Sequence, residues 1–168
     1  LRPKERWADK LVRLLKYWEN DSQLRDILIT GGDALMSRDK SLKLILDEIY
    51  KMAKKKIEAN KNKADGEKFA EIVRIRLGTR IPVYIPQRVT NTITEILAEF
   101  KAKASKIGIK QFVIQTHFES PMEITPAAKE CVKRLVSAGW TVTNQHVFTA
   151  SSSRRGHTAK LRQALNEI

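Results

Sequence analysis

Hydrophobic residues along the chain follow two alternating patterns, one with the period of a helix and one typical of strands. Helical spacing predicts amphipathic helices that begin near Pro3, near 37 or 39, at 90 or 91, at 126 and at about 158. Between them, short apolar runs predict strands at 27–29, 73–77, 112–114 and 141–148. Because no Asn-Gly hairpin signal separates the strands, the order predicts an α/β fold with about four parallel strands and flanking helices.

Several local patterns refine this prediction. The continuous run 27–29 suits a parallel strand buried on both faces, and one apolar face of the first helix consists of Trp7, Leu11, Leu14, Leu15 and Trp18. Pro82 and Pro86 predict an extended segment before a helix capped by Thr90 or Asn91, with a capping-box pair at 92 and 95. The lysine-rich stretch 54–68 predicts an exposed continuation of the second helix with a turn at 65–66.

Polar clusters stand at the carboxyl end of every predicted strand. They read Gly31-Gly32-Asp33, Gly78-Thr79-Arg80, Gln115-Thr116-His117 and Asn144-Gln145-His146. Ligands of parallel α/β folds bind at that edge of the sheet, and a Gly-Gly pair lets the backbone approach a small charged molecule closely. Each cluster also has a plain structural interpretation as an ordinary turn or cap: His117 could bond to backbone at a strand end, Gln145 could be a buried amide, and Arg80 could be a surface arginine.

Polar residues also share faces of the last two strands. Thr141, Thr143 and Gln145 alternate on one face, and Gln115 and His117 share a face of the neighbouring strand. If these faces point inward, the interior of a barrel is polar near its top, which suits a barrel that is partial or holds a cofactor. Four strands cannot close an eight-stranded barrel, so we expect residues 1–168 to form one domain that is an incomplete barrel.

Composition narrows the classes of partner. The 168 residues carry 32 Lys plus Arg against 19 Asp plus Glu, a net charge of +13 that favours anionic ligands. Few aromatic residues accompany the lysines of 54–68, so we expect no nucleic-acid partner, although a basic module for nucleic acid or an acidic partner is an alternative. The single cysteine, Cys131, excludes an internal disulfide framework and a cysteine-rich metal site. No apolar run reaches the roughly 20 residues of a membrane span and Leu1-Arg2-Pro3 does not start a signal peptide, so we expect a cytoplasmic protein with no membrane partner.

Four stretches of the sequence resemble the lysine 2,3-aminomutase family of radical S-adenosylmethionine enzymes. They are D-I-L-I-T-G-G-D-A-L at 26–35, R-I-R-L-G-T-R-I-P-V-Y-I-P-Q-R-V-T at 74–90, Q-T-H-F-E-S-P-M-E-I-T at 115–125 and S-A-G-W-T-V-T-N-Q-H-V at 137–147. The resemblance covers residues 24–147 in the right order. It implies that residues 1–168 are the middle portion of a larger (β/α) TIM-like barrel. Its full-length parent would hold a [4Fe-4S] cluster, S-adenosylmethionine and pyridoxal phosphate and would move an amino group between C2 and C3 of an amino acid.

The resemblance also implies roles for residues at the strand ends. Gly31, Gly32 and Asp33 match the segment that receives the methionine ammonium of S-adenosylmethionine, and His117 and Gln145 match positions that contact the same cofactor. Arg80 offers a guanidinium suited to a carboxylate or phosphate and completes the predicted cofactor-binding set. We predict no catalytic and no metal-binding residue within the chain.

The sequence departs from the family in ways that limit this interpretation. The CxxxCxxC cluster motif and the lysine that binds pyridoxal phosphate have no counterpart here, so we expect the fragment to be inactive alone. The stretch 54–68 is longer than expected and 148–157 differs from the family, which leaves the amino-acid substrate open. A non-radical barrel enzyme acting on a phosphorylated substrate is a further alternative, and exposed strand edges leave homo-oligomerisation open.

Overall fold

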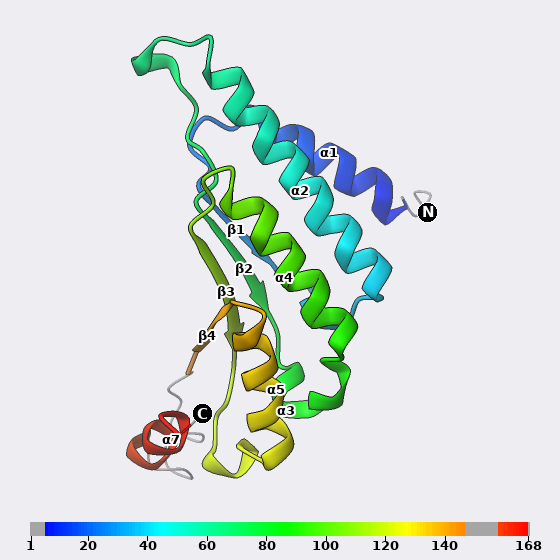
Figure 1. Cartoon of the computed structure of the whole chain (residues 1–168), viewed down its shortest axis with the longest axis vertical. Coiled ribbons are helices and arrows are strands. Elements are labelled where there is room, and N and C mark those ends of the chain that lie inside the picture. The colour runs from blue at the N-terminus through cyan, green and yellow to red at the C-terminus, as the bar shows by residue number, and fades with distance from the viewer. Residues whose placement is uncertain (1–5, 147–157, 168) are drawn as a thin grey trace, which may run out of the picture.

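The computed structural model describes residues 6–146 and 158–167, and its elements alternate between helices and parallel strands (Figure 1). The α-helices are α1 Trp7–Asn20, α2 Asp39–Asn60, α3 Ile81–Tyr84, α4 Asn91–Ser105, α5 Pro126–Ser137 and α7 Thr158–Leu165. The strands are β1 Asp26–Ile29, β2 Arg74–Gly78, β3 Gln111–Thr116 and β4 Thr141–Asn144, and short 3-10 turns lie at Ala34–Met36, Asp65–Glu67, Pro86–Arg88 and Pro121–Glu123.

The four strands form one parallel sheet in the order β1-β2-β3-β4, which confirms the predicted fold class. The register aligns Leu28 with Arg76, Arg76 with Val113, and Val113 with Thr141. Consecutive strands are therefore neighbours joined by helical crossovers, the arrangement of successive units in a (β/α) barrel.

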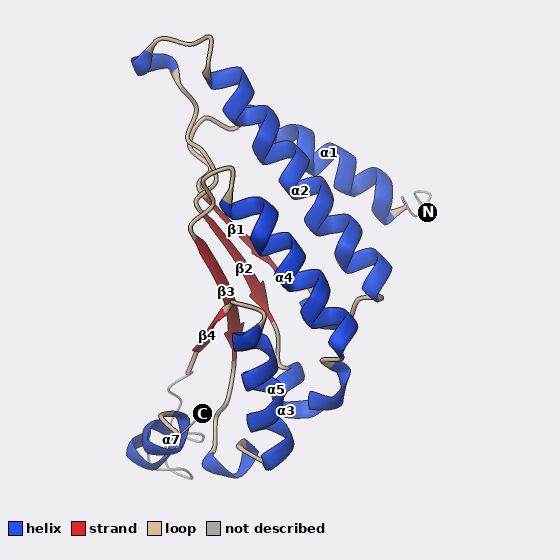
Figure 2. Ribbon diagram, in the orientation of Figure 1, coloured by secondary structure: helices blue, strands red, loops and turns tan. Residues whose placement is uncertain are grey.

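One face of the sheet carries the hydrophobic core, and α2, α4 and α5 cover it (Figure 2). Alternate strand residues point to this face, and all of them are at most 4% exposed: Ile27, Ile75, Leu77, Phe112 and Ile114. They pack against the apolar stripes of α2 and α4, to which Trp140 adds an aromatic cluster with Phe100 and Phe112. The indole Nε1 of Trp140 donates to the Leu97 carbonyl at 3.0 Å, so its one polar atom is satisfied inside the core.

The opposite face of the sheet is open and polar. The prediction that 27–29 is buried on both faces is wrong, because Leu28 lies on this face and is 40% exposed. The same face carries Arg74 and Arg76 of β2, Gln115 of β3 and Thr143 of β4. The predicted shared polar face is thus present on the strands, with no helix covering it among the described residues (Figure 2).

Helix α1 exposes part of its predicted apolar face. Leu15 is buried and Leu11 and Trp18 are half-buried, whereas Trp7 and Leu14 are 49% and 41% exposed. α1 makes its most extensive contacts with α2, so a narrow apolar stripe suffices to bury its contact surface. Strand β4 ends at Asn144, and the rest of the predicted strand up to Phe148 lies largely outside the described residues.

The proline-containing segment after β2 is helical rather than extended. Ile81–Tyr84 forms a turn of α-helix and Pro86–Arg88 a 3-10 turn, with a proline at the first or second position of each. Proline is favoured there because its fixed φ suits a helix and the missing N–H has no intrahelical partner in the first turn. The following helix is capped as predicted by Thr90, whose hydroxyl accepts from the Ile93 amide, so the capping-box pair at 92 and 95 lies inside the helix and not at its cap.

The lysine-rich segment continues α2 to Asn60 and then turns at Asp65–Glu67, as predicted (Figure 1). One of its lysines is not exposed: Lys56 is 1% exposed, and its Nζ donates to the carbonyls of Trp18 at 3.3 Å and Asp21 at 2.6 Å. Burial lowers the pKa of Lys56, against the opposing attraction of the Asp21 carboxylate. Lys56 therefore fastens the end of α1 to α2, at the end of the molecule opposite the carboxyl ends of the strands.

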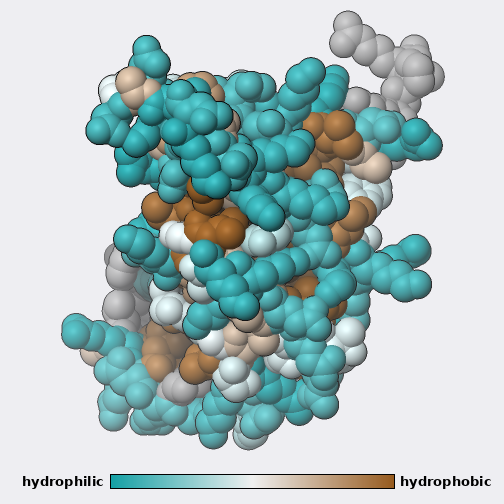
Figure 3. Space-filling view, turned by 45° about the horizontal axis from the view of Figure 1, so that its top comes forward, coloured by the Kyte–Doolittle hydropathy of each residue, from teal (hydrophilic) through white to brown (hydrophobic). Residues whose placement is uncertain are grey.

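Several exposed lysines of this segment have partners within the protein. Lys55 pairs with Glu19 at 3.6 Å, Lys61 with Glu58 at 2.8 Å, and the Lys63 ammonium lies 3.0 Å from the centroid of the Phe69 ring. The molecular surface seen in Figure 3 is largely hydrophilic, with smaller apolar areas between the polar side chains. Exposed contacts of this kind do not test the alternative of a basic docking module, so that alternative and the expected absence of a nucleic-acid partner both stay predictions.

Candidate functional site at the carboxyl ends of the strands

The carboxyl ends of the four strands meet at one edge of the sheet, where the chain runs into α3, the Pro121–Glu123 turn and the segment after β4 (Figure 1). Each strand end carries one of the predicted polar clusters. A side-chain hydrogen bond from Thr79 to Asp33 joins the ends of β1 and β2, and one from Gln115 to Gln145 joins the ends of β3 and β4. The parallel order of the strands therefore brings the predicted site residues to a common edge.

At the end of β1, Gly31 and Gly32 adopt φ values of 102° and 75°, which only glycine takes up readily. No atom lies within 4 Å of the position that a Cβ would occupy on either residue. Bare peptide groups thus face open space at this point, as the Gly-Gly pattern predicts.

The carboxylate of Asp33 holds the ends of β1 and β2 together. Its Oδ1 accepts from the Leu35 amide at 2.9 Å and from the Thr79 hydroxyl at 2.6 Å, and its Oδ2 accepts from the Arg80 amide at 2.6 Å. A carboxylate offers about four acceptor positions, so Oδ2 retains room for one more donor. Asp33 has a structural role that the sequence did not reveal, and a ligand ammonium at the remaining position stays a prediction.

The side chain of Arg80 points to the loop after β3. Its Nη2 lies 3.5 Å from Glu123 Oε1, and its guanidinium carbon lies 4.4 Å from the centroid of the Tyr84 ring. The Nε is buried and has no hydrogen-bond partner among the described residues. Arg80 contributes its backbone amide to the Asp33 anchor, while its guanidinium keeps one donor unused.

His117 belongs to the same loop. Its Nε2 lies 2.8 Å from Glu119 Oε1, an ion-pair distance without hydrogen-bond alignment, and the ring is 21% exposed. The Glu119 amide donates to Glu123 Oε2 at 2.7 Å, which connects His117 through two acidic residues to Arg80. The predicted site residues His117 and Arg80 therefore lie on one connected polar loop.

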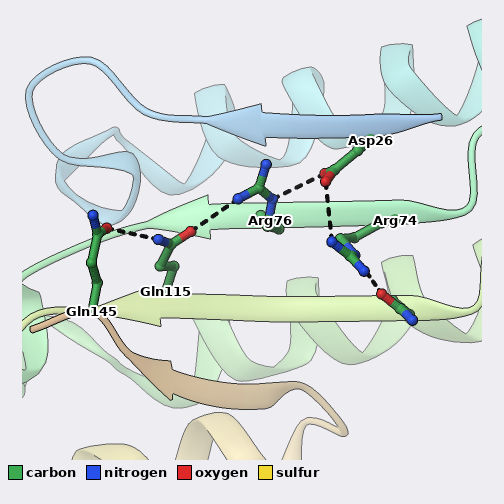
Figure 4. Close-up of polar contacts among 6 residues, drawn as sticks. Asp26, Arg74, Arg76, Gln115 and Gln145 are labelled. Carbon is green, nitrogen blue, oxygen red and sulfur yellow. Dashed lines mark hydrogen bonds and ion pairs between the residues drawn. The ribbon is translucent and has the colours of Figure 1, made fainter. Parts of the chain in front are cut away.

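Gln115 and Gln145 contact each other across β3 and β4. Gln115 Nε2 donates to Gln145 Oε1 at 2.7 Å, and the Gln145 amide N–H donates to the Thr116 carbonyl at 2.8 Å, which extends the pairing of β4 by one residue. The neighbouring Asn144 serves the backbone instead, because its amide exchanges two hydrogen bonds with Phe118. Of the neighbours Asn144 and Gln145, it is therefore Gln145 whose side chain projects onto the open face of the sheet, beside Gln115 (Figure 4).

A chain of polar contacts continues from Gln145 across the open face (Figure 4). Arg76 Nη1 donates to Gln115 Oε1 at 3.3 Å, and Arg76 Nε donates to Asp26 Oδ1 at 3.0 Å. Asp26 Oδ2 also accepts from Arg74 Nη1 at 3.3 Å, and Arg74 Nε donates to Gln111. Asp26 was not among the predicted site residues, although an acidic residue that opens a strand beside an Arg-x-Arg strand is a signal for such a contact.

The site can offer a small molecule acceptors at one end and donors at the other. Backbone carbonyls and Asp33 lie at the β1 end, whereas amide and imidazole groups lie at the β3 and β4 ends. Within the described residues, no three His, Cys or acidic side chains are grouped to hold a metal ion. Within the same residues, no helix combines the length and the apolar character needed to cross a membrane.

Comparison with known proteins gives this geometry a family. The chain is 32% identical over 160 residues, 95% of its length, to a KamA family protein of Methanocaldococcus jannaschii. It is 30% identical over 142 residues, 84% of its length, to an L-lysine 2,3-aminomutase of Methanococcus maripaludis. This stretch of sequence belongs to the lysine 2,3-aminomutase family.

A further relative within the family bears a different substrate in its name. The glutamate 2,3-aminomutase of Clostridioides difficile is 32% identical over 134 residues, 80% of the chain. The chain spans about a quarter of the length of these curated relatives, with 22%, 27% and 26% covered in the three proteins. No protein-family model matches the chain.

Proposed function

We propose that this chain forms the S-adenosylmethionine-binding side of an aminomutase that moves an amino group between C2 and C3 of an amino acid. The observation that carries the proposal is the single edge at which four polar strand ends meet, in a chain of the lysine 2,3-aminomutase family. The relatives are named for lysine and for glutamate, so the proposed substrate is the class of free amino acids.

The residues at this edge fit a methionine-type sulfonium cofactor. The open peptide groups of Gly31 and Gly32 and the remaining acceptor position of Asp33 suit its ammonium. His117 and Gln145, at the other end, can donate to its carboxylate or ribose. When bound, S-adenosylmethionine would supply, after cleavage by one electron from an external reductant, the carbon radical that takes a hydrogen atom from the substrate. The residues named here would bind and orient it.

The described residues do not fit the other two cofactors of the family. Cys131 is the one cysteine of the sequence, and burial raises the pKa of its thiol to about 11, whereas iron–sulfur clusters are held by several cysteine thiolates. Lys56, the buried lysine, donates to two carbonyls at the far end of the sheet from the candidate site. We therefore assign neither the cluster nor pyridoxal phosphate to these residues.

The test uses the full-length gene product that contains this chain, purified and reconstituted without oxygen. The reduced protein is incubated with S-adenosylmethionine, pyridoxal phosphate and lysine, glutamate or another α-amino acid in turn, and the amino acids are separated after derivatisation. The proposal predicts that a β-amino isomer of one substrate appears only when S-adenosylmethionine is present. Absence of every β-amino isomer from protein that carries its cluster would overturn it.

A pair of glycine variants links that activity to this edge. Gly32→Val forces a branched side chain onto a φ of 75° and into the open space, and should abolish product formation. Gly66→Val is the matched control, because Gly66 also faces open space but lies in the Asp65–Glu67 turn at the other end of the molecule. Equal activity of the two variants would contradict the assignment.

A further inference from the structure

We infer that Asp26, Arg76 and Gln115 act as positioning residues that fix which end of the Gln145 amide faces the ligand. They are linked in series on the open face of the sheet, from the start of β1 to the residue after β4 (Figure 4). The inference rests on the proposed function for the identity of the ligand. It adds that Gln145 presents its nitrogen, and never its oxygen, to that ligand.

The direction of the series is set by the two charged groups. An ionised carboxylate only accepts hydrogen bonds and a guanidinium only donates them. Asp26 therefore takes the Arg76 Nε–H at 3.0 Å, and Arg76 can face Gln115 only through the amide oxygen of that residue, at 3.3 Å. With its oxygen engaged by Arg76, the Gln115 amide turns its NH₂ group toward Gln145.

Backbone contacts hold both glutamines in place for this exchange. The Gln115 carbonyl accepts from the Thr79 amide at 3.0 Å, and the Gln145 amide donates to the Thr116 carbonyl at 2.8 Å. Because Gln145 Oε1 accepts the Gln115 NH₂ at 2.7 Å, its own Nε2 is directed away from Gln115 (Figure 4). A reversed Gln145 amide would set two NH₂ groups against each other.

The consequence is a site with opposite polarity at its two ends. Asp33 and the glycine carbonyls accept hydrogen bonds beside β1, whereas Gln145 donates beside β4. The ligand atom that Gln145 recognises is therefore an oxygen acceptor, either a carboxylate or a ribose hydroxyl, and an ammonium group is excluded from that position. The site can therefore bind the ammonium of an amino-acid group beside β1 and its carboxylate beside β4, but not the reverse.

The test is the affinity of the full-length protein for S-adenosylmethionine, measured by calorimetry, for four variants. Gln115→Glu keeps the contact with Arg76 but offers Gln145 only acceptors, so the Gln145 amide must turn and present its oxygen to the ligand. Affinity should fall about tenfold or more, even though the added negative charge attracts the sulfonium cation. Gln145→Met, which removes the donor, should lose less affinity for S-adenosylmethionine. Gln115→Met, which leaves the Gln145 amide free to turn either way, should lose the least affinity.

Gln111→Glu is the matched control. Gln111 lies on the same face of the same strand and contacts Arg74 as Gln115 contacts Arg76, but it stands at the opposite end of β3 from the candidate site. This variant should bind as the wild type does, and the urea midpoints of Gln111→Glu and Gln115→Glu should be equal. If Gln115 only stabilised the fold, the order of affinities would be reversed, and Gln115→Met would bind S-adenosylmethionine more weakly than Gln115→Glu.

The outcomes separate this inference from the proposed function. Wild-type protein that fails to bind S-adenosylmethionine overturns the proposed function and, with it, the inference. Wild-type binding together with undiminished binding by Gln115→Glu overturns the inference alone. Repeating the series with 5′-methylthioadenosine, which has the ribose but no carboxylate, identifies the acceptor: equal losses for both ligands indicate ribose, and a loss confined to S-adenosylmethionine indicates the carboxylate.

Discussion

Replacement of Asp33 tests how the candidate site is held together. The carboxylate accepts three hydrogen bonds, from the Leu35 amide at 2.9 Å, the Thr79 hydroxyl at 2.6 Å and the Arg80 amide at 2.6 Å. Hydrogen bonds to a charged group contribute about 1.5–3 kcal/mol each, but the three share one side chain and water can reach the half-buried loop. Asp33→Ala should therefore lower the free energy of unfolding by about 3 kcal/mol.

Asp33→Asn should lower the free energy of unfolding by less than Asp33→Ala does, because part of the hydrogen bonding is kept. Its remaining oxygen can keep the bonds from Leu35 and Thr79, while its NH₂ group faces the Arg80 amide N–H and leaves that donor unsatisfied. One unsatisfied buried donor costs about 1–3 kcal/mol, so Asn should lie between Ala and the wild type.

Urea unfolding followed by circular dichroism measures both changes. Asp65→Asn is the matched control, because the Asp65 side chain is 97% exposed and pairs only with Lys68, so its replacement should change stability by less than about 0.5 kcal/mol. If Asp33→Asn and Asp33→Ala were as stable as this control, the three hydrogen bonds would not join β1 to β2, and the structural account of the site would be refuted.

Three further predictions concern other parts of the fold. Lys56→Met should lower the free energy of unfolding by about 1–3 kcal/mol. Because folding lowers the pKa of Lys56 below 10.5, the stability difference between wild type and variant should grow as pH rises toward that value. A stability difference that shrinks with rising pH in urea titrations would contradict this. Cys131, with a pKa of about 11 and 2% exposure, should react with a thiol reagent at mildly alkaline pH far more slowly when folded than in urea, and equal rates would show that it is not buried. Gly139→Ala should cost about 1–2 kcal/mol or more, because φ is 85° and Lys101 Nζ stands 2.6 Å from the new Cβ, whereas Gly66→Ala, in open space, should be nearly neutral in the same assay.

The sequence predicted the elements whose signals are local and periodic. Thr90 caps its helix, α5 begins at Pro126, the four strands form one parallel sheet, and α7 begins at Thr158, as expected. Those signals suffice because hydrophobic periodicity and capping act within a few residues of the chain.

The predictions that failed depend on contacts between distant segments. Leu28 looked buried on both faces because an apolar run does not reveal that one face of the sheet is open. Lys56 looked solvated, since only the fold brings the carbonyls at the end of α1 to it. The proline segment 82–86 looked extended because proline is compatible both with an extended chain and with the first turn of a helix.

Strand order placed the four polar clusters at one edge of the sheet, as predicted, but the contacts among their side chains were not foreseen. Parallel strands bring their carboxyl ends to one edge, so four polar clusters sufficed to predict where they would meet. The three hydrogen bonds to Asp33 and the contact of Asp26 with Arg76 depend on which side chains face each other across the sheet. Register decides that, and a single sequence does not specify register for polar residues on an open face.

The most direct test of the central claim is a crystal structure of the full-length protein with S-adenosylmethionine bound. The account predicts that the methionine ammonium lies against the peptide groups of Gly31 and Gly32, and that Gln145 Nε2 donates to a carboxylate or ribose oxygen of the cofactor. A cofactor bound away from the carboxyl ends of β1 to β4 would contradict the account.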